Sequence, residues 1–416
     1  MSNAIVLCKN SPRRIAAPVC VCLLLWVCLG APGPAAAQNV ASEVPYYSRG
    51  SGIGISSQDS LFLLNIRFRL QSRVGYETET DRNLRLERLR TRLERLRLRL
   101  DGFFYKPELT YVIQLGFSDS DMNVNPGAPS PSIVKDAVIF YRFNRNLSLG
   151  LGLTNLPRNR QAVISSGDLE LVDRSPLTSV FGVQRDYGLQ VYYYNSTGGV
   201  YYALRGAVTA GEGDNAVNSE KGLSYTARAE LLPLGTFSGK GDYFEGDLER
   251  EEKPKVSLGL TYNLNRSTTG TGGGSAEPLH EPRDIAAFMA DFLLKFRGLS
   301  VSVEHLTNDT RKSPVTAGED GAESYAWVGS GQNFQLGYVF PSNWGVAIRH
   351  ARLSPDTRLS SKAQEYREVT LGASRYIKGH RLKMQADLSR RQERAVPPGA
   401  GSGGFFLMRV QLEVGL

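Results

Sequence analysis

Hydrophobic and polar residues alternate along most of the chain. From Phe62 to Leu70 every second residue is apolar, and from Asn65 to Arg73 the positions between them carry arginine, asparagine or glutamine. The last residues repeat the pattern, because residues 404–416 place apolar side chains at even positions and Arg409, Gln411 and Glu413 at odd positions. A period of two predicts a β-strand with one apolar and one charged face.

Sixteen segments of the chain share this pattern, and the connections between them alternate between short and long. An even number of antiparallel strands places both chain ends on the same side of a sheet. The predicted strands are 61–76, 94–104, 108–118, 134–144, 147–156, 186–194, 200–210, 223–232, 255–264, 284–297, 299–308, 332–340, 344–353, 366–377, 381–390 and 404–416.

Two folds suit strands of this kind, a soluble sandwich and a transmembrane barrel. Alternating short turns and long loops, with aromatic residues such as Tyr105, Tyr141 and Trp344 beside the short turns, are typical of outer-membrane barrels. We therefore predict an all-β, transmembrane antiparallel β-barrel of about 16 strands, with short periplasmic turns and long outer loops. Sixteen strands leave an aqueous channel. One connection departs from the pattern, since residues 234–254 form a long acidic segment on the side of the short turns.

The segment Leu84–Leu100 has two interpretations. Its leucines at 86, 89, 93, 96 and 100 have the spacing of an amphipathic helix, whereas Leu96, Leu98 and Leu100 also alternate with arginines as in a strand. We predict a strand from about Glu94 onward, and a loop or short helix at 84–93. A basic helix could bind nucleic acid, but an exported chain does not suit that function.

The N-terminus predicts export. Lys9, Arg13 and Arg14 precede an apolar run that ends in small residues at 35–37, which indicates a signal peptide of residues 1–37 cleaved after Ala37. Residues 38–60 would then be a short periplasmic segment and 61–416 the barrel domain. All four cysteines lie in the signal, so the mature chain has none. The absence of cysteine excludes disulfide scaffolds and thiol enzymes. Removal of the signal lowers the formal net charge from +8 to +5.

Several stretches resemble the phosphate-selective porin O/P family. They are RLRLRLDGFFYKPELTYVIQLGFS (95–118), KDAVIFYRFN (135–144), SGDLELVDRSPL (166–177), RDYGLQVYY (185–193), FEGDLEREEKPKVSLGLTYN (244–263) and GYVFPSNWGVAIRHARL (337–353). The resemblance implies a sixteen-stranded, trimeric porin in which residues 157–184 fold inward as a constriction loop. The chain departs from it at the end, where Leu416 replaces the terminal aromatic residue common in outer-membrane barrels.

Arginines dominate the positions that we assign to the lumen. Rings or ladders of arginine attract anions, and the planar guanidinium suits phosphate or carboxylate oxygens. The candidate pore-lining and anion-binding residues are Arg67, Arg69, Arg95, Arg97 and Arg99 on the first two strands, with Arg158, Arg160 and Arg174 in the predicted constriction loop. The same loop carries acids that could neutralise its arginines, namely Asp168, Glu170 and Asp173.

We therefore predict an outer-membrane porin for passive diffusion of small solutes, with a preference for phosphate or similar anions. The alternatives are a weakly selective general diffusion porin and a structural or adhesive barrel without a transport role. The expected partners are outer-membrane lipid, two further copies in a homotrimer, small anions and the barrel-assembly machinery, without nucleic acid.

An enzyme does not fit this sequence. The four histidines, at 280, 305, 350 and 380, stand in no recognisable motif with a serine nucleophile, and the glycine run 270–274 lacks the lysine of a phosphate-binding loop. We accordingly expect no catalytic residues, no cofactor and no metal. An energised receptor would need an N-terminal plug domain, for which residues 38–60 are too few.

Overall fold

Each strand buries its polar face and exposes its apolar face, the reverse of a soluble protein. In the strand Ser224–Leu232, Arg228 and Glu230 are 2% and 3% exposed, whereas Tyr225 and Leu231 are each 40% exposed. The computed structural model describes residues 52–59, 61–122, 132–213, 222–270, 278–394 and 402–416. An exposed apolar face beside a polar interior suits a sheet that is wrapped in lipid around a polar lumen.

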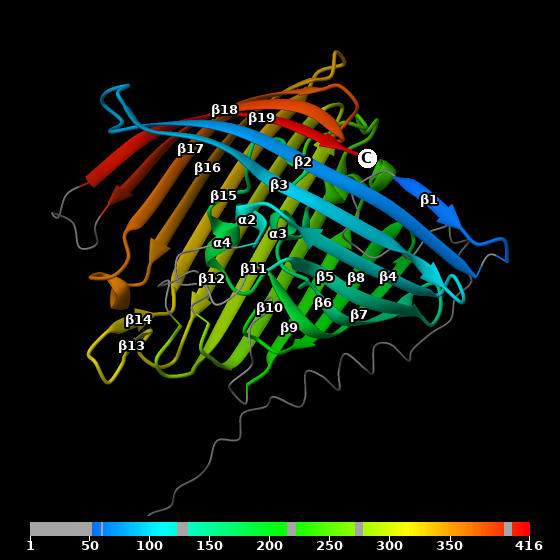
Figure 1. The fold of residues 1–416 in the computed structure, drawn as a ribbon, viewed down its shortest axis with the longest axis horizontal. Coiled ribbons are helices and arrows are strands. Elements are labelled where there is room, and N and C mark those ends of the chain that lie inside the picture. The colour runs from blue at the N-terminus through cyan, green and yellow to red at the C-terminus, as the bar shows by residue number, and fades with distance from the viewer. Residues whose placement is uncertain (1–51, 60, 123–131, 214–221, 271–277, 395–401) are drawn as a thin grey trace, which may run out of the picture. The chain divides into compact units, whose positions relative to one another are not determined.

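Sixteen strands of the described residues form a closed antiparallel barrel, which confirms the predicted fold class (Figure 1). The ring closes where β2 pairs with β19, and β9 pairs with β10 within it. The barrel strands are β2 (Phe62–Thr78), β3 (Leu86–Phe104), β4 (Leu109–Gly116), β5 (Val134–Arg142), β6 (Leu147–Asn155), β7 (Arg185–Thr197), β8 (Val200–Thr209), β9 (Ser224–Leu232), β10 (Lys255–Thr268), β11 (Arg283–Phe296), β12 (Leu299–Asp309), β15 (Gly329–Val339), β16 (Trp344–Pro355), β17 (Glu365–Tyr376), β18 (Leu382–Arg394) and β19 (Ser402–Gly415).

A few short elements lie outside this ring. The strand β1 (Ile53–Ser56) pairs with residues 63–66 of β2, just beyond the point where β19 ends opposite Arg69. The predicted signal peptide, residues 1–37, lies outside the described residues. The remaining elements are the hairpin β13 (Val315–Ala317) and β14 (Glu323–Tyr325), the helices α2 (Asp119–Met122), α3 (Arg160–Val163) and α4 (Leu177–Val180), and the 3-10 turns η1 (Ser238–Tyr243) and η2 (Thr357–Leu359).

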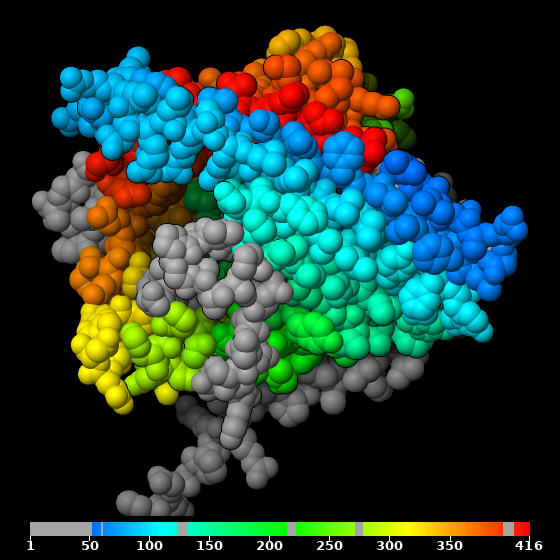
Figure 2. Space-filling model, in the orientation of Figure 1, coloured from blue at the N-terminus to red at the C-terminus, as the bar shows by residue number. Residues whose placement is uncertain are grey.

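The strand β3 corrects one prediction. Residues 86–93, expected as a loop or short helix, are strand and pair with β2. Glu94 is an unpaired bulge residue, because Arg95 faces Gln71 while Leu93 faces Ser72. One extra residue reverses the alternation, so Leu89 and Leu93 share a face with Leu96. The bulge therefore produces a leucine spacing that resembles a helix, and the β2–β3 hairpin extends outward at the upper left of Figure 2.

The two ends of the barrel differ, as predicted. Short connections such as 105–108, 198–199 and 297–298 gather at one end, called here the turn end, and the long connections other than 233–254 lie at the other, the loop end. Aromatic rings meet beside the short turns, where the Tyr338 and Phe340 centroids are 4.8 Å apart. Arg375 lies over the Trp344 ring at 5.6 Å, which is an interfacial position rather than a buried charge.

Two connections fold into the barrel and fill part of its interior. The 157–184 loop, which carries α3 and α4, runs inside the ring of strands (Figure 1), and Leu169, Leu171 and Val172 are each 1% exposed. Leu177 and Phe181 pack against wall residues such as Met289 and Leu306 in the largest apolar cluster. The second is the 233–254 connection between β9 and β10, which enters from the turn end. No helix of the described residues is long and apolar enough to cross a membrane.

Candidate functional site

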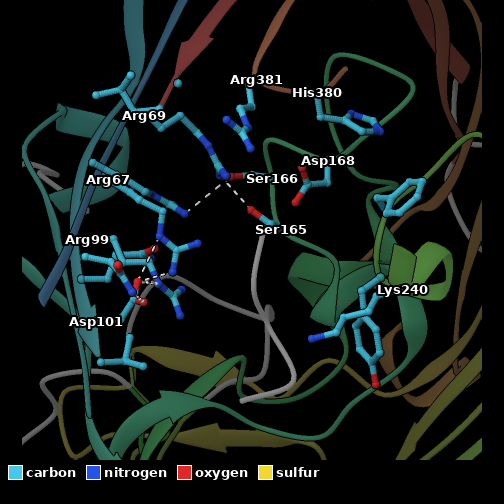
Figure 3. Close-up of a pocket in the computed structure, with 18 of the residues that line it drawn as sticks. Arg67, Arg69, Arg99, Asp101, Ser165, Ser166, Asp168, Lys240, His380 and Arg381 are labelled. Atoms are coloured by element: carbon cyan, nitrogen blue, oxygen red, sulfur yellow. Dashed lines mark hydrogen bonds and ion pairs between the residues drawn. The ribbon is translucent and has the colours of Figure 1, made fainter. Parts of the chain in front are cut away.

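The strands β2 and β3 place arginines directly opposite one another. Their register pairs Arg67 with Arg99 and Arg69 with Arg97, and all four line the same cavity. Like charges in direct cross-strand positions destabilise a sheet. Figure 3 shows Arg67, Arg69 and Arg99 on one side of this cavity. The wall therefore concentrates positive charge at a cost in stability.

Asp101 partly neutralises the first of these pairs. Its Oδ1 accepts a hydrogen bond from Arg67 Nε at 3.0 Å and lies 3.3 Å from Arg99 Nε. Asn65 Nδ2 donates to its other oxygen at 3.3 Å. Because Asp101 is 4% exposed, one buried carboxylate serves two guanidinium groups.

The second arginine pair finds its partners in more distant parts of the chain. Arg97 Nε donates to Asp121 Oδ1 at 2.9 Å, and Asp121 comes from α2. Arg69 Nε lies 3.3 Å from Glu413 Oε1, and its Nη1 donates to Ser165 Oγ of the 157–184 loop at 2.8 Å. The loop can approach this closely because residue 167 is a glycine. A Cβ at this position would lie 2.4 Å from Arg69 Cζ.

Arg95 belongs to a different cluster. Its Nη1 donates to Gln71 Oε1 at 2.8 Å, and its Nη2 lies 3.7 Å from Asp173 of the loop. Asp173 also pairs with Arg73 at 2.8 Å and with Arg409 at 3.3 Å. One loop carboxylate therefore joins three arginines of the wall, and Arg95 is not among the residues that line the cavity.

The three loop arginines lie in different surroundings. Arg158 is 2% exposed and donates to the carbonyl of Phe181, and Arg160 is 1% exposed and lies 3.1 Å from Glu230 of β9. Neither lines the cavity: Arg158 joins two parts of the loop, and Arg160 joins the loop to β9. Arg174 does line it, while donating to the carbonyls of Gln161 (3.0 Å) and Ile164.

The cavity between the arginine wall and the two inward connections has a volume of about 960 Å³. Ten basic side chains and five acidic ones line it among the described residues. The basic ones are Arg67, Arg69, Arg97, Arg99, Arg142, Arg174, Arg185, Lys240, Lys378 and Arg381, and the acidic ones are Asp101, Asp136, Asp168, Glu249 and Glu413.

Five of these basic residues were not among the predicted site residues: Arg142 of β5, Arg185 of β7 and three outside the barrel strands. Lys240 belongs to the 233–254 connection, and Lys378 and Arg381 flank the short turn between β17 and β18. All three come from the turn end, whereas alternation identifies inward positions only within strands. Figure 3 shows Lys240 across the cavity from Arg67 and Arg99, and Arg381 between Arg69 and His380. The cavity consequently extends from the 157–184 loop to the turn end of the barrel.

Asp242, Glu245 and Asp247 of the 233–254 connection are directed into the barrel, whereas Glu249 and Glu252 are exposed. Asp242 lies 3.5 Å from Arg160, and Asp247 Oδ2 accepts a hydrogen bond from the Gly298 backbone at 2.7 Å. Glu245 accepts from Gln161 Nε2 at 2.8 Å and from Gln335 Nε2 at 3.0 Å. These three side chains are buried, and their contacts hold the connection in place.

No group of three or more histidine, cysteine or acidic side chains in the described ranges is arranged to hold a metal ion. His380 contacts the ring of Phe244 at 5.7 Å and the carbonyl of Glu245 at 3.1 Å, so it packs against the 233–254 connection.

Comparison with known families tests the resemblance seen in the sequence. The family model of phosphate-selective porins O and P matches residues 64–245. This match covers the first eight barrel strands, the 157–184 loop and part of the 233–254 connection, and it is consistent with the family that the sequence resembles. No curated protein matches the chain in sequence.

Solved porin structures share the fold at low sequence identity. Salmonella typhi OmpF in complex with daunomycin matches at 11% identity and a TM-score of 0.53, covering 88% of this chain and all of its own, 100%. Pseudomonas putida OprB at high pH matches at 11% identity and a TM-score of 0.52, covering 85% of this chain and 94% of its own. The trimer form of Vibrio cholerae OmpT matches at 10% identity and a TM-score of 0.50, covering 84% of this chain and 98% of its own.

The porin match and the barrel together indicate an outer-membrane channel for passive diffusion rather than an enzyme. The cavity beside β2 and β3, lined also by residues of the two inward connections, is the candidate lumen of such a channel.

Proposed function

We propose that the protein is an outer-membrane porin whose lumen prefers small anions, phosphate or similar oxyanions among them. The observation that carries this proposal is the excess of ten basic over five acidic side chains around the cavity. Fixed positive charge along a pore attracts anions and repels cations. Guanidinium groups in pairs, as at Arg67 and Arg99, also match the oxygens of a phosphate or carboxylate.

A weakly selective diffusion pore is the second candidate. It is favoured by the acids beside the arginine wall, where Asp101, Asp121 and Glu413 each lie within 3.3 Å of an arginine nitrogen. Paired charges hydrate a channel without strongly selecting ions. We favour anion preference because these acids do not balance the further basic side chains at the turn end, such as Lys378 and Arg381.

The surroundings of the barrel follow from the same proposal. The signal peptide would be cleaved after Ala37, the barrel-assembly machinery would insert the chain, and the turn end would face the periplasm. The exposed apolar face of the strands would contact outer-membrane lipid. A homotrimer is the proposed assembly, supported by the trimer form of the similar OmpT structure.

Single-channel recording in a planar bilayer under a potassium chloride gradient tests this function. We expect a reversal potential of the sign for chloride preference, and reduction of the current when inorganic phosphate is added. Replacing Arg97 and Arg99 by glutamine removes two charges from the wall and should weaken the phosphate block at least about tenfold, the factor for 1.4 kcal/mol. Arg88→Gln is the matched control, because Arg88 lies on the same strand but is exposed at the loop end.

Each other outcome supports a different function. A reversal potential of the opposite sign, or near zero, would indicate the general diffusion pore. Folded protein without any conductance would indicate a structural or adhesive barrel.

A further inference from the structure

The 233–254 connection brings apolar side chains to the cavity, facing the arginine wall. Tyr243, Phe244 and Leu248 line the cavity together with Lys240 of the same connection. In Figure 3, Lys240 lies across the cavity from Arg67 and Arg99. An anion inside the cavity would therefore meet guanidinium groups on one side, and on the other an apolar surface with one ammonium group; the same connection also adds the carboxylate of Glu249 to the lining.

The apolar surface is held in place by polar contacts. The ring of Tyr243 lies 5.0 Å from the guanidinium carbon of Arg160, and its hydroxyl donates to Glu230 at 3.3 Å. The ring of Phe244 lies 4.1 Å from Lys295 Nζ, which also donates to the Phe244 carbonyl at 2.8 Å. These contacts fix the two aromatic side chains at the cavity, so that they do not depend on a bound solute for their position.

The cavity is larger and more apolar than a small inorganic ion requires. A volume of about 960 Å³ is at the upper end for pockets that enclose drug-sized organic molecules. Leu63, Phe103, Val112 and Val163 add further apolar surface to the lining. A phosphate ion surrounded by its hydration shell gains nothing from apolar walls, whereas a solute with a hydrocarbon body buries surface against them.

We propose that this cavity favours organic anions with an apolar body, of which aromatic carboxylates are the simplest. The carboxylate would lie toward the arginine wall, and the apolar body would pack against Leu248 and the rings of Tyr243 and Phe244. Lys240 is the specificity residue that raises the local concentration of anions at this surface. The proposal rests on the anion preference proposed above, and deepens it by naming the class of solute.

Reversal potentials measured with benzoate or acetate replacing chloride on one side test the proposal. In a plain aqueous pore benzoate, the larger ion, permeates less than acetate. We expect benzoate to permeate at least as well as acetate through this channel. Leu248→Ser should lower the benzoate-to-acetate permeability ratio about fourfold, the factor for one lost CH₂ contact of about 0.8 kcal/mol. Leu248→Asn provides a second variant if the first does not fold.

Charge variants of the same connection separate the two contributions. Lys240→Gln should lower the permeability of both carboxylates relative to potassium. Lys253→Gln is its matched control, because Lys253 is exposed in the same connection and does not line the cavity; this variant should match the unmodified protein.

Benzoate permeating less than acetate, with a ratio that the Leu248 variants do not change, would overturn the proposal. That result is distinguishable from failure of the anion preference itself, which would appear in potassium chloride alone as a cation-selective reversal potential.

Discussion

Asp101 controls how much of the charge on Arg67 and Arg99 is available to a passing ion. Its carboxylate lies between the two guanidinium groups and is buried beneath them. Asp101→Asn keeps the size of the side chain but removes the negative charge. We expect a stronger preference for chloride over potassium, together with a loss of about 1–3 kcal/mol in unfolding free energy, because two opposed arginines would lose the negative charge that they share. Reversal potentials and urea unfolding in lipid measure the two effects.

The control for this variant is Glu252→Gln, which removes one acid from an exposed position at the turn end. It should change neither quantity. If Asp101→Asn leaves the reversal potential unaltered, the charge of this arginine pair does not reach the permeating ions, and the selectivity must arise elsewhere in the cavity.

At the scale of single residues, alternation could identify basic positions on strands but not their partners. Arg67, Arg69, Arg97 and Arg99 lie at the cavity as their positions in the strand pattern suggest. The partner of Arg97 is Asp121, a residue of a short helix in the following loop, and no periodic pattern indicates where a loop side chain points. For the same reason the burial of Arg158 and Arg160 could not be read from the sequence.

At the scale of elements, the contact between the 157–184 loop and the 233–254 connection centres on two carboxylates. Gln335 Nε2 donates to Glu170 at 3.1 Å and to Glu245 at 3.0 Å, and the Glu170 backbone donates to Glu245 at 2.9 Å. A Cβ at Gly337 would lie 2.1 Å from Glu170 Oε1, so only glycine admits this close approach. Burial and then the charge of Glu245 raise the pKa of Glu170 to about 7, although Lys295 opposes the shift.

This pKa shift predicts a pH-dependent contact. A carboxyl with a raised pKa in the folded state keeps its proton there, so the contact is most stable below the ordinary pKa of glutamate. It weakens by up to about 1.4 kcal/mol per pH unit as the pH rises toward 7. Single-channel records should therefore become noisier between pH 5 and pH 7, as the inward connections loosen.

Glu170→Gln mimics the protonated side chain and should make the noise independent of pH over this range. Glu319→Gln, an exposed position at the loop end, should keep the pH dependence of the unmodified channel. Equal pH dependence in all three proteins would exclude Glu170 as its source.

The elements also show where a periodic pattern misleads. The leucine spacing in residues 86–100 matches a helix only because the bulge at Glu94 shifts the strand by one residue. The inward folding of the 233–254 connection could not be predicted either. Two of its acids, Asp247 and Glu245, are bound by donors far away in the sequence, the Gly298 backbone and Gln335.

At the scale of the whole molecule, the sixteen strands and the two unlike ends follow from the sequence, because every strand repeats the same alternation and the connection lengths alternate with them. The volume of the cavity that stays open inside the barrel cannot be predicted from the sequence. That volume depends on how the two inward connections pack against the walls and against each other, which is set by contacts between Glu245, Gln161 and Gln335 rather than by any local pattern.

The summed charge of the lumen leads to a prediction about salt. The ten basic and five acidic side chains surround the whole cavity, so their effect on a small ion is a long-range field. Such a field extends about 30 Å at 0.01 M salt and about 3 Å at 1 M. The preference for chloride over potassium should therefore decline steeply between these concentrations, as reversal potentials measured at a fixed gradient ratio would show.

The preference for benzoate over acetate should respond differently, because contact between apolar surfaces is not screened by salt. We expect the benzoate-to-acetate ratio to persist at 1 M while the chloride preference is lost. A chloride preference of equal size at both concentrations would contradict the field argument, since it would require chloride to bind at a local site among the arginines. A benzoate preference that disappears together with the chloride preference would mean that both carboxylates respond to charge alone, and that the apolar surface of the 233–254 connection makes no contact with the permeating ion.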